Sequence, residues 1–564
     1  MCGICFSLRW GDADNEQFED LSRKLQVANA ARGPDAQGLH KAYVKPAVDP
    51  SSHLVLEFYA SELRLRGEGA VVQPHEKDDD VLCWNGEIFD GMDISPEEND
   101  GARLFEQLRR LDTPGQIRDL FASIEGPYAF VYYQASSQRL FFARDPLGRR
   151  SLLIHKPSPA SPYFLLASVS AGADPRYEFD ELSTEHIYCL DIHRITRADE
   201  LILEIPAMAR RASSTDPSKP FAEPSKVNPS MPSPEESPSV TALDQKRHAP
   251  CAEHTPSIGR KGHARLAVLF SGGIDSTVIT FLAHRYIPLD EPIDLLNVAF
   301  ENPRKVKMQA EGNLGGVSKK QRKARERAAK RTDEATCTSY DVPDRVTGLQ
   351  EVEELRRLCP ERIWNFVEIN VPYEESQSAR PTIESLMWPA RTVMDMSLAL
   401  ALYFASQGAG QVRNSPGAEP ISYASTARVL LNGLGSDELL GGYGRHRTAY
   451  NTGGWQSVIE ELQLEIDRIP TRNLGRDDRV ISSHGKETRH PFLSLVVLDF
   501  LARLPVNQKM DPRSEVGLGD KMLLRLAARK LGLVEASQRK KRAMQFGSHS
   551  ARMDGERRGD MLLE

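Results

Sequence analysis

A polar stretch near the middle of the chain, residues 205–262, constrains the fold more than any other feature. Proline, serine, lysine and glutamate dominate it, as in STDPSKPFAEPSKVNPSMPSPEESPS, and almost no apolar periodicity remains. Such a segment cannot bury enough apolar surface to offset the entropy lost on ordering, so it predicts a flexible linker or surface insert. Because 564 residues also exceed what one hydrophobic core serves, we expect two domains, residues 2–204 and 263–564.

The first of these domains alternates short apolar runs with turn residues. Runs rich in Val, Tyr, Phe and Leu and bounded by Gly, Pro, Asp and Asn are typical of strands; they lie at 54–60, 80–86, 128–134, 139–145 and 163–169. Apolar residues at three- and four-residue spacing predict helices over Asn15–Ala31 and Ala102–Leu111. The pattern indicates an α+β domain.

The second domain begins with a strand, a glycine turn, a helix and a second strand, at 264–270, 271–276, 277–286 and 293–300. This order predicts a doubly wound parallel sheet, and therefore an α/β domain. Helices dominate the remainder, for example Val393–Ser406, Gly453–Arg468 and Lys521–Leu531. Polar inserts are expected near 302–335 and 408–420.

Charge and composition narrow the class of protein. The formal net charge is −7, so bulk attraction to nucleic acid is not expected. The longest apolar runs fall well short of the roughly 20 residues that cross a bilayer, and no signal peptide is expected. Seven scattered cysteines fit reduced thiols, so we expect a cytoplasmic protein. The basic insert Ser318–Arg331 leaves a nuclear signal open, although a solvated surface segment is the favoured interpretation.

The second residue of the chain is a candidate nucleophile. Removal of Met1 would give Cys2 a free α-amine, and this amine, with a reference pKa of about 7.7–8.0, can take the proton of the thiol. Many chains begin Met-Cys by chance, so this feature is weak by itself. Cys5 completes a CxxC, but no second pair accompanies it, so we do not expect a zinc site there.

Five short motifs follow Cys2 in a fixed order: RGPD (32–35), RLRG (64–67), NGEI (85–88), Asp100 and RDPLG (144–148). As an ordered set they resemble the class II glutamine amidotransferase domain of asparagine synthetases, an N-terminal-nucleophile hydrolase fold. The resemblance implies that Cys2 attacks the side-chain amide of glutamine and releases ammonia. It also implies that Asn85 and Gly86 form the oxyanion hole and that Arg64, Glu87 and Asp100 bind the α-carboxylate and α-amine of glutamine.

A glycine-rich loop, Ser271-Gly272-Gly273-Ile274-Asp275-Ser276, joins a strand to a helix in the second domain. Glycines let the backbone approach phosphate closely, and the start of the helix directs N–H groups toward it. The loop lacks the Lys-Ser/Thr of a Walker motif. It resembles the pyrophosphate loop of ATP pyrophosphatases, which include asparagine synthetases, and this resemblance places Phe270 and Val298 beside adenine.

A second loop, 432–438 (NGLGSDE), resembles the synthetase loop that closes on AMP and magnesium, so Asn432 and Gly433 are expected at the nucleotide. Asp275 and Asp437 are then the expected Mg²⁺ ligands. Lys541 matches the lysine that stabilises the adenylylation transition state, although it lies in a basic run, Arg539–Arg542.

The segments DVPDRVTG (341–348), TVMDMS (392–397), RNLGRDD (472–478) and AMQFGS (543–548) are similar, almost word for word, to the eukaryotic asparagine synthetase domain-containing proteins. The implied activity is the ATP-dependent amidation of aspartate by glutamine. One position departs from the synthetases: Leu434 stands where they carry a glutamate thought to prepare ammonia for attack. A leucine cannot accept a proton.

Two alternatives therefore stay open beside asparagine synthesis. The synthetase half has lost aspartate amidation and serves binding or regulation, or another carboxylic acid is the acceptor. A β-lactam-synthetase-like activity is disfavoured, because those proteins lack the catalytic N-terminal cysteine. The expected partners are glutamine, ATP, Mg²⁺ and a carboxylic acid.

Overall fold

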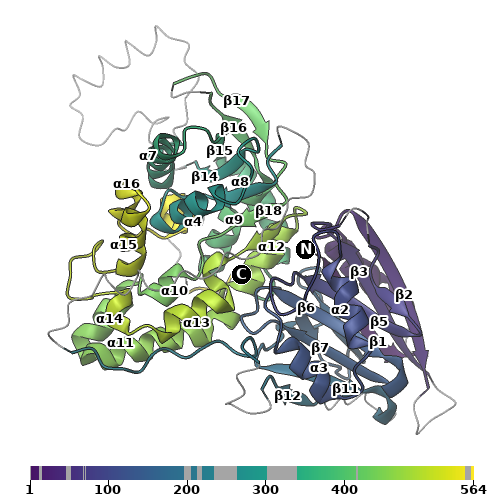
Figure 1. Ribbon diagram of the computed structural model, residues 1–564. Coiled ribbons are helices and arrows are strands. Elements are labelled where there is room, and N and C mark those ends of the chain that lie inside the picture. Colours follow the sequence, from purple (N-terminus) through teal and green to yellow (C-terminus); the bar gives the residue numbers. More distant parts are fainter. Residues whose placement is uncertain are drawn as a thin grey trace, which may run out of the picture.

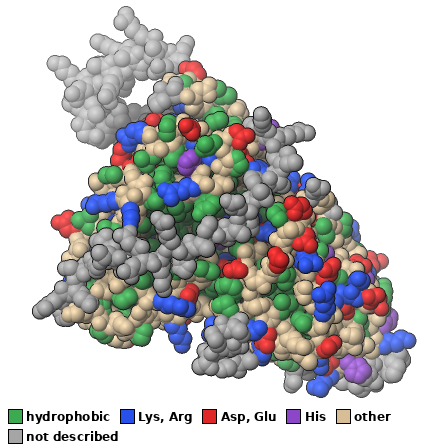
Figure 2. All heavy atoms as spheres, in the orientation of Figure 1, with side chains coloured by type: hydrophobic (Ala, Val, Ile, Leu, Met, Phe, Trp, Pro, Cys, Tyr) green, Lys and Arg blue, Asp and Glu red, His purple; other side chains and the backbone are tan. Residues whose placement is uncertain are grey.

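The computed structural model describes residues 2–11, 15–45, 53–67, 69, 71–195, 205–211, 219–233, 263–301, 340–414, 417–552 and 560–563. Figure 1 shows two domains side by side, with the strands β1–β12 in one and the strands β13–β19 in the other. On the face drawn in Figure 2, basic and acidic side chains are interspersed over the first domain. None of the helices in the described part of the chain has the length and apolar character needed to cross a bilayer.

The first domain is built on two six-stranded sheets, in the orders β10-β8-β9-β1-β3-β2 and β12-β11-β7-β6-β5-β4. The strands are β1 (Gly3–Trp10), β2 (Ala36–Val44), β3 (Leu54–Glu62), β4 (His75–Lys77), β5 (Asp80–Gly86), β6 (Tyr128–Gln134), β7 (Arg139–Arg144), β8 (Leu153–His155), β9 (Tyr163–Ala167), β10 (Asp180–Glu181), β11 (His186–Asp191) and β12 (Ala207–Ala209). The helices are α1 (Asn15–Ala30), α2 (Asp100–Leu108), α3 (Pro114–Phe121) and the 3₁₀ turns η1 (Ala135–Ser137) and η2 (Ile192–Arg194). All neighbouring strands with a recorded register are antiparallel.

The core of this domain lies between the two sheets. Phe6, Phe58 and Leu56 of one sheet share a buried cluster with Val131 and Phe142 of the other. The outer faces are buried too, under α1 on one side and under α2 and α3 on the other. Central strands such as β1 are therefore buried along their whole length, which is why they form continuous apolar runs rather than alternating patterns.

The second domain contains a seven-stranded sheet in the order β17-β16-β15-β14-β13-β18-β19. Its strands are β13 (Leu266–Leu269), β14 (Ile293–Phe300), β15 (Trp364–Val371), β16 (Ala409–Val412), β17 (Ile421–Ala424), β18 (Val429–Leu431) and β19 (Glu487–Arg489). The five neighbouring strands β15, β14, β13, β18 and β19 are parallel to one another. At one edge of the sheet, β16 pairs antiparallel with β15, and β17 pairs antiparallel with β16. The strand–helix–strand order read from the sequence is the order observed.

Helices cover both faces of this sheet. They are α4 (Ile274–His284), α7 (Pro343–Leu358), α8 (Tyr373–Met387), α9 (Val393–Gln407), α10 (Ser436–Leu440), α11 (Gly444–Arg472), α12 (Leu474–Ser482), α13 (Leu495–Arg503), α14 (Val506–Lys509), α15 (Met522–Lys530), α16 (Val534–Ser537), α17 (Met544–Gly547) and the turns η4 (Pro491–Leu493) and η5 (Ser550–Arg552). Val268 and Leu295 pack on the side of α4 and α7, whereas Ala267 and Leu296 pack on the side of α8 and α9. This alternation is that of a doubly wound sheet.

The sheet order places a crevice at one particular pair of strands. In chain order the five parallel strands are β13, β14, β15, β18 and β19, and in space they read 3-2-1-4-5. The direction of winding therefore reverses between β13 and β18. Ligands of open α/β sheets bind beside the carboxyl ends of the strands at such a switch point. The two glycine-rich loops identified in the sequence follow these two strands.

Part of the predicted linker is ordered and joins the domains. Residues 219–233 cross from the first domain to the helices of the second (Figure 1), beginning where the Phe221 N–H donates to the Ala122 carbonyl at 3.2 Å. Val227 is buried in the apolar cluster of the second domain, and its N–H donates to Gln463 Oε1 at 2.8 Å. We call residues 219–233 the strap. Its polar composition gave no sign of its ordered structure, because one or two buried apolar residues are enough to fix an extended segment. β12 likewise extends the first domain into the predicted linker.

The two predicted inserts have different outcomes. In the 408–420 insert, β16 forms a hairpin with β17, which follows the insert, and this hairpin extends the sheet at its edge. The 302–335 insert, including the basic run Ser318–Arg331, lies outside the described residues.

The domain interface contains buried ion pairs around α12, the RNLGRDD segment. Arg32 of the first domain pairs with Asp478 at 2.7 Å, and neither side chain is exposed. The same carboxylate accepts the Ser151 N–H at 3.0 Å, while Arg32 also donates to the Cys2 carbonyl at 3.2 Å. One arginine thus links the backbone of the candidate nucleophile to the second domain.

Candidate active sites

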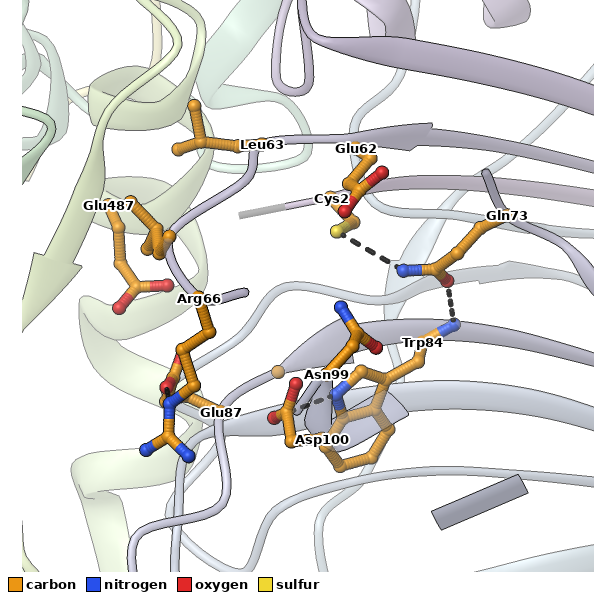
Figure 3. A pocket seen from close by; sticks show the side chains of 12 residues that line it. Cys2, Glu62, Leu63, Arg66, Gln73, Trp84, Glu87, Asn99, Asp100 and Glu487 are labelled. Atoms are coloured by element: carbon orange, nitrogen blue, oxygen red, sulfur yellow. Dashed lines mark hydrogen bonds and ion pairs between the residues drawn. The ribbon is translucent and has the colours of Figure 1, made fainter. Parts of the chain in front are cut away.

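A pocket opens beside Cys2 at the junction of the two sheets of the first domain (Figure 3). Its lining consists of Cys2, Glu62, Leu63, Leu65, Arg66, Gln73, Trp84, Gly86, Glu87, Asn99, Asp100 and Glu487. Four of these side chains are carboxylates and one is a guanidinium. All but Glu487 belong to the first domain.

Cys2 and Asn85 are held together at the base of this site. The Cys2 backbone nitrogen donates to Asn85 Oδ1 at 2.9 Å. Asn85 is fully buried, and its Nδ2 has no hydrogen-bond partner among the described residues. A buried donor without a partner destabilises a fold by about 1–3 kcal/mol, so a ligand atom that accepts a hydrogen bond from Nδ2 would be favoured here. Burial raises the pKa of the Cys2 thiol, so a base must take its proton.

Gln73 is a site residue that the sequence analysis did not single out. Its Nε2 lies 3.5 Å from Cys2 Sγ, and its Oε1 accepts the Trp84 N–H at 2.8 Å. The amide is therefore held in one orientation by β5 and points its nitrogen at the sulfur (Figure 3). The only signal in the sequence was the Gln-Pro that precedes a short strand, and it carries no chemistry by itself.

The predicted amine-binding carboxylates both lie in the pocket. Glu87 pairs with Arg66 through Oε1, and its Oε2 lies 3.6 Å from a guanidinium nitrogen of Arg489. Asp100 Oδ1 accepts the Gly101 N–H at 2.9 Å, and Oδ2 accepts the Ile88 N–H at 3.0 Å. Burial and the nearby Glu87 raise the pKa of Asp100 to about 7.

Arg64 and Arg66 occupy different environments. Arg64, the predicted partner of the glutamine carboxylate, is exposed and is absent from the pocket lining, and its N–H donates to Asp35 Oδ2 at 2.8 Å. Arg66 lines the pocket instead and pairs with Glu87. In a strand, residues two apart such as 64 and 66 would point to the same side. The strand β3 ends at Glu62, so this rule no longer holds for Arg64 and Arg66. Of these two arginines, Arg66 is the one that lines the pocket.

The phosphate loop has the geometry that its glycines predict. Gly272 has φ = +73°, and a side chain there would meet the backbone of Gly348 at 2.4 Å. Gly273 caps α4, and its carbonyl accepts from Ser276 Oγ at 3.1 Å. The first N–H groups of an eleven-residue helix thus face the crevice beyond β13.

The second glycine loop lies directly against the first. A side chain at Gly433 would come within 2.9 Å of the Asp275 Cβ. Asn432 is fixed at both ends: its N–H donates to the Arg489 carbonyl at 2.9 Å, and its Oδ1 accepts the Leu434 N–H at 3.1 Å. Leu434 itself packs against the apolar cluster of this domain.

Two lysines bring the acidic residues of these loops together. Lys521 Nζ lies 2.6 Å from Asp275 Oδ2 and 2.7 Å from Asp437 Oδ1, and its side chain is 1% exposed. Lys541 Nζ lies 2.9 Å from Asp437 Oδ2 and 3.7 Å from the centre of the Tyr443 ring. Burial acts to raise the pKa of Asp437, but the two lysines outweigh it and hold this pKa below its usual value.

Sequence reasoning missed Lys521, which follows an unremarkable GLGD at the start of α15 and adopts φ = +51°. Its buried position next to both aspartates appears only once the chain is folded. Of the two predicted adenine-reading positions, Phe270 directly follows β13 and Val298 lies within β14. Asn297 joins these strands by donating to the Phe270 carbonyl at 2.8 Å.

A pocket beside Cys2 in one domain and two glycine-rich loops at a sheet switch point in the other are the features expected of an amidotransferase domain joined to a synthetase domain. Comparison with known families agrees: residues 63–171 match the glutamine amidotransferase domain, and residues 450–561 match asparagine synthase. Two relatives are named asparagine synthetase domain-containing protein 1. The human protein is 36% identical over 98% of this chain and 96% of its own, and the chicken protein 33% identical over 98% of each.

A yeast relative, asparagine synthetase domain-containing protein YML096W of Saccharomyces cerevisiae, is 31% identical over 98% of this chain and 94% of its own. The chain belongs to this family of asparagine synthetase domain-containing proteins.

Proposed function

We propose that this protein hydrolyses glutamine at Cys2 and uses the ammonia, with ATP, to convert a carboxylic acid into its amide. The observation that carries the proposal is the contact between the Cys2 nitrogen and Asn85 Oδ1 at 2.9 Å, together with the unpaired Nδ2 of the same amide. After removal of Met1 that nitrogen is an α-amine, and Asn85 fixes its position. One side chain then serves both the base and the oxyanion.

In the proposed glutaminase step, the α-amine takes the thiol proton and the sulfur attacks the Cδ of glutamine. The developing oxyanion receives hydrogen bonds from Asn85 Nδ2 and the Gly86 N–H. Ammonia leaves with the proton, and water hydrolyses the resulting thioester to glutamate. Arg66 is suited to the α-carboxylate and Glu87 to the α-amine, because both line the pocket beside the sulfur. Arg66 replaces Arg64 in this role.

In the proposed synthetase step, the phosphates of ATP lie in the crevice between the loops after β13 and β18. Asp275 Oδ1 has no hydrogen-bond partner among the described residues, and Asp437 lies on the facing loop, so the pair fits Mg²⁺. The ion would supply charge neutralisation at the phosphates. Lys521 and Lys541 add positive charge at the same place, where pyrophosphate would leave.

The identity of the acceptor depends on Leu434. Aspartate is the acceptor suggested by the family, but Leu434 packs into the apolar cluster and supplies no base for incoming ammonia. This observation favours a second candidate, a protein that hydrolyses glutamine and binds ATP but does not make asparagine. A different carboxylic acid as the acceptor is the third.

The test uses the purified full chain with its N-terminus defined by mass. Glutamate release is measured for the parent and for Cys2→Ala, and pyrophosphate and amide formation are measured with glutamine, ATP and Mg²⁺ over a panel of carboxylic acids including aspartate. Cys2-dependent glutamate release with pyrophosphate formation supports the ligase. Glutamate release that persists in Cys2→Ala, or a mature chain that keeps Met1, overturns the glutaminase. ATP binding without pyrophosphate from any acid favours the regulatory candidate.

A further inference from the structure

Glu87 and Arg66 neutralise one another in the pocket. Their ion pair joins Glu87 Oε1 to Arg66 Nε, and Arg66 also donates to the Ile88 carbonyl at 3.2 Å. Glutamine is a zwitterion, so its binding requires Arg66 to turn toward a carboxylate and Glu87 toward an ammonium. The internal pair must therefore separate, and something else must keep Glu87 in place when it does.

Arg489 is in the position to do this. Its guanidinium lies 3.6 Å from Glu87 Oε2, whereas Arg66 Nε contacts Oε1 of the same carboxylate. It is fixed from two other sides: its Nε lies 2.6 Å from Glu487 Oε1, and its guanidinium carbon lies 5.3 Å from the centre of the Phe89 ring. Arg489 is 27% exposed, whereas Glu87 is 6% exposed, so the pair is largely shielded from solvent.

Both Arg489 and its partner Glu487 belong to β19 of the second domain, and Glu487 faces the pocket from that side (Figure 3). β19 lies beside β18 at the nucleotide crevice, and the Arg489 carbonyl holds the Asn432 N–H at 2.9 Å. β19, whose last residue is bonded to the 432–438 loop, therefore also presents a cation to the proposed amine-binding carboxylate of the other domain.

We propose that Arg489 is a positioning residue of the glutamine pocket, which holds Glu87 where it receives the α-ammonium of glutamine. This inference rests on the proposed glutaminase function and adds that the glutamine site is completed by the second domain. Its effect is on binding, because Arg489 is not near the sulfur or the oxyanion donors in the contacts described.

Loss of Arg489 should therefore change KM but not kcat, and it should affect glutamine but not a substrate that lacks the α-amine. Arg489→Gln should raise the KM for glutamine about tenfold or more, the order expected for losing a contact to a charged group, with little change in kcat. Arg489→Lys should restore part of the loss. Glutaramate, which is glutamine without its α-amine, makes no demand on Glu87, so its KM should change little in the same variants.

The matched control is Arg428→Gln. Arg428 also reaches across the domain interface, to Asp35 Oδ1 at 3.0 Å, but neither residue lines the pocket. A general weakening of the interface would affect both arginine variants and both substrates alike. Retained ATP affinity in each variant, measured by calorimetry with Mg²⁺, shows that the fold is intact.

The experiment separates this inference from the function on which it rests. With Cys2-dependent glutamate release present in the parent, an unchanged glutamine KM in Arg489→Gln overturns the role of Arg489 alone. Equal losses for glutamine and glutaramate also overturn it, because the effect would then not pass through the amine. Absence of Cys2-dependent release overturns the glutaminase itself. A selective loss for glutamine, partly restored by lysine, supports the inference.

Discussion

Asn85 Oδ1 accepts the Cys2 N–H at 2.9 Å, and Asn85 Nδ2, which has no partner among the described residues, is the proposed oxyanion donor. Asn85→Ala should therefore lower kcat for glutamate release by about 10²–10³-fold, the usual cost of one oxyanion donor, with a smaller effect on KM. Asn85→Asp keeps the size and the acceptor oxygen but removes the N–H. Steady-state glutamate assays on both variants are the measurement. A kcat near the parent value in Asn85→Asp would contradict the donor role.

Leu434 is the position where family resemblance and chemistry disagree. It packs against the apolar cluster of the second domain and offers no proton acceptor. We expect little or no asparagine from the parent protein, and a gain in Leu434→Glu of at most the general-base factor of about 10²–10⁴. Leu434→Gln is the control, because it adds polarity without a base. Asparagine formation is measured by amino-acid analysis, and rapid synthesis by the parent protein would refute the prediction.

Helix α12 joins the domains through a carboxylate that is buried on all sides. Asp478 pairs with Arg32 at 2.7 Å and approaches Arg150 at 3.6 Å, and none of the three is exposed. Asp478→Asn would remove the carboxylate that pairs with the buried Arg32, whereas Arg150 keeps Glu487 at 2.9 Å, so we expect the free energy of unfolding to fall by about 3–5 kcal/mol. Denaturant titration measures this loss. Asp35→Asn, at the exposed pair with Arg428, should cost no more than about 1 kcal/mol.

The ion pair of Asp478 with Arg32 also makes the free energy of unfolding depend on pH, and the sign of this dependence can be derived. Burial opposes ionisation of Asp478, but Arg32 and Arg150 outweigh it and hold its pKa below the usual value. A pKa depressed in the folded state stabilises the protein above the unfolded pKa, near 3.9, and this stabilisation is lost as the pH falls through the folded value. The gap in unfolding free energy between parent and Asp478→Asn should thus be full at neutral pH and close on acidification. A gap that stays constant into strong acid would rule out the ion pair as its cause.

The sequence predicted elements better than contacts. Apolar runs such as YAFVYYQ and the strand–glycine–helix junction at 271–276 depend on local patterning, and they became β6 and the turn into α4. The strap 219–233 and the hairpin of β16 and β17 were missed, because a few apolar anchors in polar surroundings leave no periodicity. Gln73, Lys521 and Arg489 were missed for another reason: their environment is made by distant segments, and isolated polar residues carry no signal of it.

The two candidate sites of the molecule lie in different domains but share structural contacts. The pocket beside Cys2 is lined mainly by the first domain, the two glycine-rich loops lie in the second, and Arg489 of β19 contacts both. If the proposed function holds, damage to one site should leave the chemistry of the other in place. Coupling through the interface is then a matter of affinity rather than of shared catalytic groups.

Asp275→Asn and Cys2→Ala test this division in opposite directions. Asp275→Asn removes an oxygen ligand at the phosphate loop and a partner of Lys521, so Mg²⁺-dependent ATP affinity should fall about tenfold or more, while kcat for glutamate release without ATP stays near the parent value. Cys2→Ala should lose glutamate release but keep ATP affinity and any amidation supported by free ammonia. Calorimetry and glutamate assays on the same preparations are the measurements. Loss of both glutamate release and ATP binding in either variant would show that the two sites depend on one another for their structure. Equal ATP affinity in Asp275→Asn and the parent would show that Asp275 is not part of the nucleotide site.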